Sequence, residues 1–105
     1  MNNDLTMTTD LIESVKSKLN FNTDTQVFIS PSFPFLQEAI KKCKGTKINV
    51  TAQNINENES GAYTGEVSSS MLKSIGINSV IIGHSERRQY FNESDSILLK
   101  KVKKA

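Results

Sequence analysis

Strand-like and helix-like segments alternate along this 105-residue chain, and the alternation constrains its fold more than any other feature. Residues 26–30 predict a strand stopped by Pro31, and residues 48–52 predict a second strand. Residues 80–82 form a β-branched run typical of a third strand, buried on both faces. Strands that alternate with helices through short connections imply right-handed βαβ units and a parallel sheet, so the predicted class is α/β.

The helical stretches show apolar residues at helical spacing and polar residues suited to cap them. Their expected first residues or caps are Asp10 with the threonines before it, Ser32 with Pro34, Ser68 or Ser69, and Ser94. Gly45 and Gly76 are placed to end the second and third helices. Three parallel strands complete neither a barrel nor a protected open sheet, so we expect residues 1–105 to be one incomplete domain.

Composition and charge exclude several classes of protein. A net charge of +2 is too small to indicate nucleic acid or a membrane surface as a partner, and no apolar stretch is long enough to span a bilayer. The single cysteine, Cys43, cannot form an internal disulfide, so a cytoplasmic location is expected. Its neighbouring lysines leave two interpretations open, a thiol of lowered pKa and a thiol without function, and the second is favoured. One histidine, one cysteine and scattered carboxylates predict no metal site, and no phosphate-binding glycine motif occurs.

The only histidine, His84, lies where the third predicted strand gives way to a helix. Catalytic groups of α/β proteins collect at the carboxyl ends of parallel strands, so this position favours a catalytic role over a structural one. Free backbone N–H groups at the start of the following helix would donate to one ring nitrogen, and the other would carry the hydrogen. A long loop is expected over about residues 55–67, and its segment 61–68 is the second informative feature, because a polar loop of this length with two glycines is not expected to be a plain connection in a compact fold.

Taken together, these segments resemble the triosephosphate isomerase family over essentially the whole chain. The matching motifs stand in family order: Ala52-Gln53-Asn54, Gly61-Ala62-Tyr63-Thr64-Gly65-Glu66-Val67-Ser68, Met71-Leu72-Lys73, Gly83-His84-Ser85-Glu86-Arg87-Arg88 with Phe91, and Glu93-Ser94-Asp95. The resemblance implies a (β/α)₈ TIM barrel, typically of ~250 residues, of which this chain would hold the first helix through most of the fourth. The first strand, with a substrate-binding lysine, and the second half, with the glutamate base and the lid, would lie outside it.

The activity implied by the resemblance is the interconversion of dihydroxyacetone phosphate and glyceraldehyde 3-phosphate through an enediolate, in glycolysis and gluconeogenesis. Such an isomerase needs no cofactor, but it needs a carboxylate base and a donor that polarises the carbonyl oxygen. His84 would be that donor, as a neutral imidazole. The chain alone, without the base and the lysine, is expected to be inactive.

The resemblance also implies roles for neighbouring residues. Ser85 would hold the glutamate base in the open enzyme, although a helix N-cap explains a serine there about as well. Glu86 would pair with the upstream lysine, whereas Arg87 and Arg88 are expected to form structural ion pairs rather than bind phosphate. Gln53 and Asn54 would order that lysine or a dimer contact, with loop capping as the alternative.

In the family, the loop that matches residues 61–68 projects into the partner subunit of a homodimer. Tyr63, Thr64, Gly65 and Glu66 would form its tip, and Thr64 would reach near the partner's active site. A mobile surface loop is the plainer interpretation. The rival hypothesis for the whole chain is a flavodoxin-like α/β binding module without a catalytic role, which would show an open sheet. The lysine pairs at 100–101 and 103–104 are interpreted as a solvated helix face.

Overall fold

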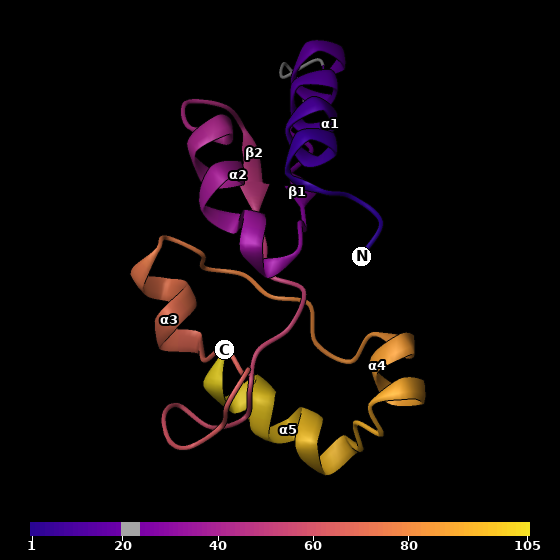
Figure 1. Ribbon diagram of the computed structural model, residues 1–105, viewed down its shortest axis with the longest axis vertical. Helices are drawn as coiled ribbons and strands as arrows, with labels where there is room; N and C mark the ends of the chain where they lie inside the picture. Colours follow the sequence, from indigo (N-terminus) through magenta and orange to yellow (C-terminus); the bar gives the residue numbers. More distant parts are fainter. Residues whose placement is uncertain (20–23) are drawn as a thin grey trace. The chain divides into compact units, whose positions relative to one another are not determined.

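The computed structural model describes residues 1–19 and 24–105, which form two compact units, Met1–Thr51 and Ala52–Ala105. The first unit contains the helices α1 (Leu5–Lys18) and α2 (Leu36–Cys43), the short 3₁₀ helix η1 (Phe33–Phe35), and the strands β1 (Val27–Ile29) and β2 (Ile48–Val50) (Figure 1). The two strands pair in parallel, with Val27 opposite Ile48. This pairing confirms the predicted parallel βαβ arrangement at the level of two strands and the helix between them.

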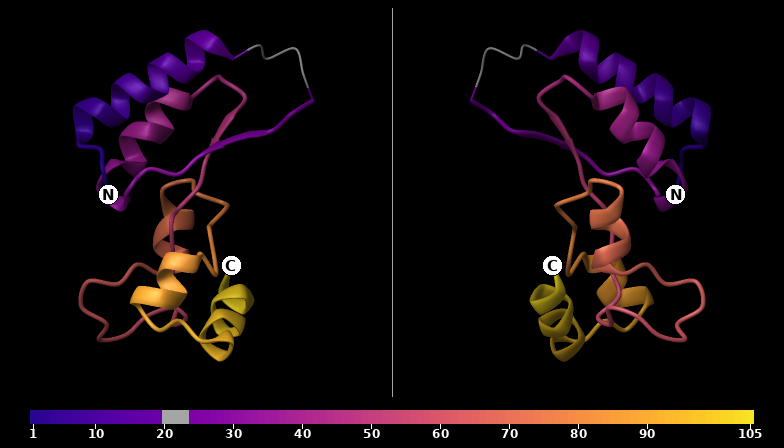
Figure 2. Two further views of the ribbon diagram at one scale, coloured as in Figure 1. Left: turned by 90° about the vertical axis from the view of Figure 1, so that its right-hand side faces the viewer. Right: turned by 90° about the vertical axis from the view of Figure 1, so that its left-hand side faces the viewer.

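One face of this small sheet forms the core of the first unit. Side chains alternate between the two faces along a strand. The paired residues Val27 and Ile48 therefore share a face with the partly buried Ile29 and Val50. Helices α1 and α2, which lie side by side in Figure 2, pack Ile12 and Cys43 against that face. Phe28 points to the opposite face and is half exposed. Burial raises the pKa of the Cys43 thiol, so the interpretation of a thiol with a lowered pKa is wrong.

Helix α1 begins well before the expected position. Asp4 is its N-cap and its carboxylate accepts a hydrogen bond from the backbone N–H of Met7 at 2.8 Å. The prediction that Asp10 and the nearby threonines cap the helix is therefore wrong. Asp10 lies inside the helix on its exposed side, because an earlier aspartate already satisfies a free N–H of the first turn. The start predicted at Ser32 and Pro34 corresponds to η1, which leads into α2.

The second unit contains α3 (Ser69–Ser74), α4 (Ser85–Tyr90) and α5 (Asp95–Lys104). Ser68 caps α3 and Ser94 caps α5 through their hydroxyl oxygens, as predicted. The loop of residues 55–67 contains no helix or strand, and it projects to one side of this unit in Figures 1 and 2. The buried apolar side chains of this unit are those of Ala52, Ile55, Leu72, Ile77 and Leu98.

Residues 80–82 do not form the predicted third strand, and they are not buried on both faces, so this prediction is wrong. Val80 forms a single parallel bridge with Ala52, in which Ala52 N donates to Ser79 O at 3.0 Å and Ile81 N donates to Ala52 O at 2.8 Å. Ile81 is 37% exposed, and Val80 and Ile82 are half-buried. A strand buried on both faces needs cover on each side, and Ala52 is the one bridge partner of Val80 within the described residues.

Candidate functional site

His84 caps the N-terminus of α4 with its own side chain. Gly83, with φ 78°, turns the chain into the helix, and His84 Nδ1 then accepts a hydrogen bond from Glu86 N at 3.3 Å. The expected donation of a helix N–H to one ring nitrogen is confirmed. With Nδ1 an acceptor, a neutral ring carries its hydrogen on Nε2, which leaves Nε2–H as the donor available to a ligand. Ser85 is the first residue of the helix rather than its cap, so the alternative interpretation of this serine as the cap is wrong.

Glu86 lies beside the same ring, with its Oε2 3.7 Å from His84 Nδ1. The two side chains are 50% and 72% exposed, so a charge pair between them is screened by water. The imidazole therefore stands at the surface of this unit, held by one backbone donor and open on its other nitrogen.

The two arginines after Glu86 form the expected ion pairs. Arg87 Nε donates to Glu93 Oε1 at 2.6 Å, and the guanidinium lies over the Phe91 ring, 4.4 Å from its centroid. Arg88 donates to Asp95 Oδ1 at 2.7 Å and, through Nε, to Gly83 O at 3.3 Å. Arg88 thus links the turn that precedes His84 to the first turn of α5.

A polar cluster links α4 to α5 through Arg87, Glu93, Lys101 and Asn54. The sequence analysis did not predict this cluster. Glu93 is 7% exposed and Lys101 is 3% exposed. Glu93 Oε1 accepts from both Arg87 Nε and Lys101 Nζ at 2.6 Å, and Lys101 Nζ also donates to the buried Asn54 Oδ1 at 2.6 Å. Burial alone would raise the pKa of Glu93, but hydrogen bonds from Lys101 and then Arg87 outweigh it and hold the pKa below its usual value.

This cluster corrects the interpretation of the lysine pairs as a solvated face, because Lys101 is buried. The spacing of the helix could have indicated this burial, because Lys101 follows the buried Leu98 by three residues and so lies on the same face. The cluster joins three parts of the second unit: α4 through Arg87, α5 through Lys101, and the bridge region through Asn54. It thereby braces the helix whose first turn carries His84.

The predicted loop residues Tyr63, Thr64, Gly65 and Glu66 lie together at an exposed tip. Glu66 Oε2 accepts a hydrogen bond from Asn56 Nδ2 at 2.8 Å, from the other side of the loop. Gln53 is exposed and Asn54 is buried, so these neighbours have different surroundings, and Asn54 contacts Lys101.

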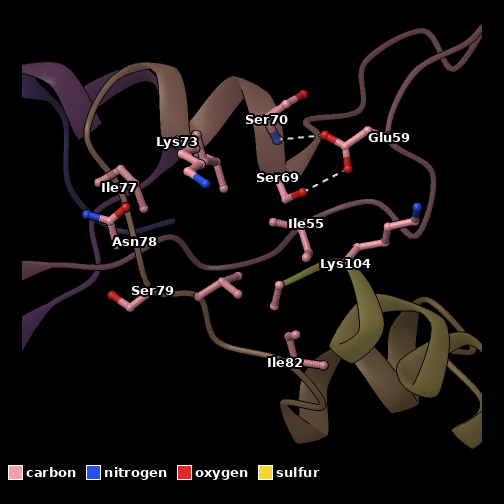
Figure 3. Close-up of a pocket in the computed structure, with 13 residues that line it drawn as sticks. Ile55, Glu59, Ser69, Ser70, Lys73, Ile77, Asn78, Ser79, Ile82 and Lys104 are labelled. Carbon is pink, nitrogen blue, oxygen red and sulfur yellow. Dashed lines mark hydrogen bonds between the residues drawn. The ribbon is translucent and has the colours of Figure 1, made fainter.

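An open cavity of about 650 Å³ lies elsewhere in the second unit (Figure 3). Its lining includes the apolar side chains of Ile55, Leu72 and Ile77 and the charged side chains of Glu59 and Lys104. The predicted catalytic and supporting residues are not among its lining residues. Within residues 1–19 and 24–105, no three His, Cys, Asp or Glu side chains are grouped to hold a metal ion. No helix of the described chain has the length and apolarity to cross a membrane.

Comparison with known proteins confirms the resemblance over the whole chain. The sequence model of the family described as triosephosphate isomerase matches residues 1–105. The triosephosphate isomerase of Flavobacterium psychrophilum is 48% identical over 102 residues, which cover 97% of this chain and 41% of that protein. That of Clostridium acetobutylicum is 45% identical over 105 residues, 100% of this chain and 42% of the relative. The chain thus spans about two-fifths of the length of the curated relatives it matches.

Proposed function

The chain belongs to the triosephosphate isomerase family, and on that premise we propose that the protein containing it interconverts dihydroxyacetone phosphate and glyceraldehyde 3-phosphate. The observation that carries the proposal is the match over all 105 residues, which includes the segment around His84. The same match favours an isomerase over the alternative of a flavodoxin-like binding module. The reaction belongs to glycolysis and gluconeogenesis and takes place in the cytoplasm without a cofactor.

In the proposed mechanism, His84 is the electrophile. A base removes a proton from the carbon next to the substrate carbonyl, and the electron pair moves onto the carbonyl oxygen to give an enediolate. His84 Nε2–H donates to that oxygen, and the hydrogen bond strengthens as negative charge develops there. The donation of Glu86 N to Nδ1 supports this role, because it fixes the ring with Nε2–H as the donor. Ser85 and Glu86 position the base and the upstream lysine, and Gln53, Asn54 and Arg87 support the site.

We propose that residues 1–105 are part of a single (β/α)₈ barrel domain, from its first helix to its fourth. The parallel pairing of β1 and β2 around α2 supports this arrangement. The complete protein is a homodimer, in which the tip formed by Tyr63, Thr64, Gly65 and Glu66 docks into the other subunit. Its exposed position in the isolated chain supports a role as a contact surface.

The assignment of His84 is tested by His84→Gln in a protein of the relatives' length that contains this chain. We expect kcat to fall by about 100-fold or more, with KM changed by less than about threefold, because the lost hydrogen bond is strongest in the transition state. Gln89→Ala, a change at an exposed position on the same helix, should retain wild-type kinetics. Wild-type turnover in His84→Gln would exclude His84 as the electrophile.

The 105-residue chain by itself is proposed to be inactive. It supplies a donor for the carbonyl oxygen but no glutamate matching the family's base, and proton abstraction from carbon without a placed base leaves most of the barrier in place. A coupled assay of the purified chain should give no rate above buffer. Turnover at a thousandth of an ordinary isomerase rate would mean that other groups in this chain perform the chemistry.

A further inference from the structure

One residue, Asn56, joins the two arms of the loop of residues 55–67 through both its backbone and its side chain. We call the point where the arms meet, at Asn56 and Val67, the neck of the loop. Asn56 N donates to Val67 O at 2.8 Å, which joins the two arms of the loop. The side chain then reaches further along both arms. Its Oδ1 accepts from Asn58 N at 2.8 Å, and its Nδ2 donates to Glu66 Oε2 at 2.8 Å. Because a carboxylate only accepts hydrogen bonds, the amide nitrogen must face Glu66 and the amide oxygen must face Asn58.

A second anchor fastens the outgoing arm to α3. Glu59 Oε2 accepts from Ser69 Oγ at 3.0 Å and Glu59 Oε1 accepts from Ser70 N at 3.1 Å (Figure 3). Hydrogen bonds from Ser70 and then Ser69 hold the pKa of Glu59 below its usual value, so the carboxylate is ionised near neutral pH. The loop is therefore tied at the neck by Asn56 and along one arm by Glu59.

The tip of the loop has its own internal contacts. Tyr63 N donates to Gly61 O and Glu66 N donates to Tyr63 O, both at 3.0 Å. The Tyr63 ring lies against Gly61, where an added Cβ would be 2.7 Å from Tyr63 Cε2. Each of these contacts is made within one copy of the chain. The tip therefore has internal contacts that can hold its shape without a second chain.

We propose that Asn56 holds the 61–66 tip in its docking shape before a second copy of the chain binds, so that the interface loop is preformed. The inference rests on the proposed function, which makes the second copy the partner. A preformed loop loses less conformational entropy on association than a loop that folds on its partner, and this raises affinity without any new contact. Asn56 is thus a positioning residue for the interface, although it lies at the neck rather than at the tip.

A donor–acceptor exchange between Asn56 and Glu66 tests the proposal in the 105-residue chain. Asn56→Asp keeps an oxygen that accepts from Asn58 N. It also places a second carboxylate against that of Glu66, and the two negative charges repel each other. We expect the backbone amides of residue 56, at the neck, and Glu66, at the tip, to exchange with solvent about tenfold faster, whereas the Asn58 amide keeps its acceptor. In the double variant Asn56→Asp with Glu66→Gln, the amide introduced at position 66 donates to the carboxylate introduced at position 56, and exchange should return to within about threefold of wild type. Asn78→Asp adds the same charge at an exposed position of this unit and should leave loop exchange unchanged.

The second measurement is the dissociation constant of the dimer, by sedimentation of the longer protein. Asn56→Asp should weaken the dimer about tenfold and the double variant should recover most of the loss. Unchanged loop exchange in Asn56→Asp would overturn the role of Asn56. Faster loop exchange with an unchanged dimer would overturn preformation as a contribution to docking. If instead the wild-type longer protein is a monomer, the proposed homodimer fails while the exchange result still reports on Asn56.

Discussion

Asn92 holds the backbone in the left-handed region, with φ 53°, and is the one non-glycine residue with positive φ among those described. It lies between Phe91, the C-cap of α4, and Glu93, whose N–H donates to Arg87 O at 3.3 Å. The sharp turn at Asn92 is what returns Glu93 toward Arg87 on the preceding helix. Asparagine tolerates this conformation better than other L-residues with a side chain, but glycine adopts it most readily.

Substitutions at Asn92 should therefore follow backbone preference rather than side-chain size. We expect Asn92→Ala to lower the free energy of unfolding by about 1 kcal/mol, because alanine adopts the left-handed region less readily than asparagine does. The free energy of unfolding of Asn92→Gly should be no more than about 0.5 kcal/mol below that of wild type. Urea denaturation of the three proteins measures both differences. Equal midpoints for the alanine and glycine variants would show that the left-handed backbone at Asn92 carries no strain.

At the same scale, the sequence predicted His84 and its ring nitrogen contact but not the residues behind it. A histidine between an apolar run and a helical turn can be placed from local pattern alone, since Glu86 N is only two residues away. Lys101 and Asn54 are 47 residues apart, and no local pattern indicates that they meet. Lysine is also seldom buried unless it is paired, so its default interpretation is a solvent-exposed side chain.

At the scale of elements, ion pairs join α4 to α5. Arg87 and Lys101 share one carboxylate oxygen of Glu93, and Arg88 pairs with Asp95. The caps of α3 and α5 were predicted because a serine at an N-cap acts locally. The run at 80–82 was predicted as a strand, yet it forms only a bridge at Val80, because a strand depends on pairing with distant segments that the run itself does not specify.

Removal of the Glu93 charge should weaken the joint between these helices. Glu93→Gln leaves Arg87 and Lys101 without a buried anion, so we expect a loss of ~3 kcal/mol in the free energy of unfolding at pH 7. The pKa of Glu93 is lowered in the folded chain, so its stabilisation is complete above the unfolded-state pKa of about 4.3. That stabilisation disappears as the pH falls through the lower folded-state pKa. The difference between wild type and Glu93→Gln should therefore shrink as the pH falls from 6 toward 3.

Urea denaturation across that pH range measures the difference directly. Glu57→Gln removes a carboxylate from the same unit outside the cluster and serves as the control for the change in net charge. Glu13 and Glu59 also have lowered pKa values, so the wild type loses stability in acid from several sites, and only the comparison isolates Glu93. A constant difference from pH 6 to pH 3 would argue that the Glu93 charge is not what joins the two helices.

At the scale of the whole molecule, the chain matches the family along its entire length but spans about two-fifths of the relatives. Local patterns are sufficient to predict the parallel pair β1–β2 and the starts of α3 and α5, but not the start of α1. The barrel and the dimer depend on segments far apart in sequence or on a second chain, so they come from the family resemblance and remain proposals. The loop at 61–66 belongs to both groups. Its shape comes from hydrogen bonds between residues close in sequence, whereas its proposed role is a contact with a second chain.

A charged residue at the tip of that loop tests the proposed dimer. In a protein of the relatives' length, Thr64→Arg should leave a folded subunit, because Thr64 is exposed in the isolated chain. The bulky guanidinium would enter a fitted pocket of the other subunit without a partner for its charge, so we expect the dimer to weaken at least about 100-fold. Activity at nanomolar concentration should fall with it, since each active site is proposed to be braced by the neighbouring loop. Thr25→Arg, the same change at an exposed position in the first unit, should remain dimeric and active. Sedimentation and kinetics of the two variants decide the matter, and a Thr64→Arg protein that stays dimeric and fully active at nanomolar concentration would rule out this loop as the interlocking element.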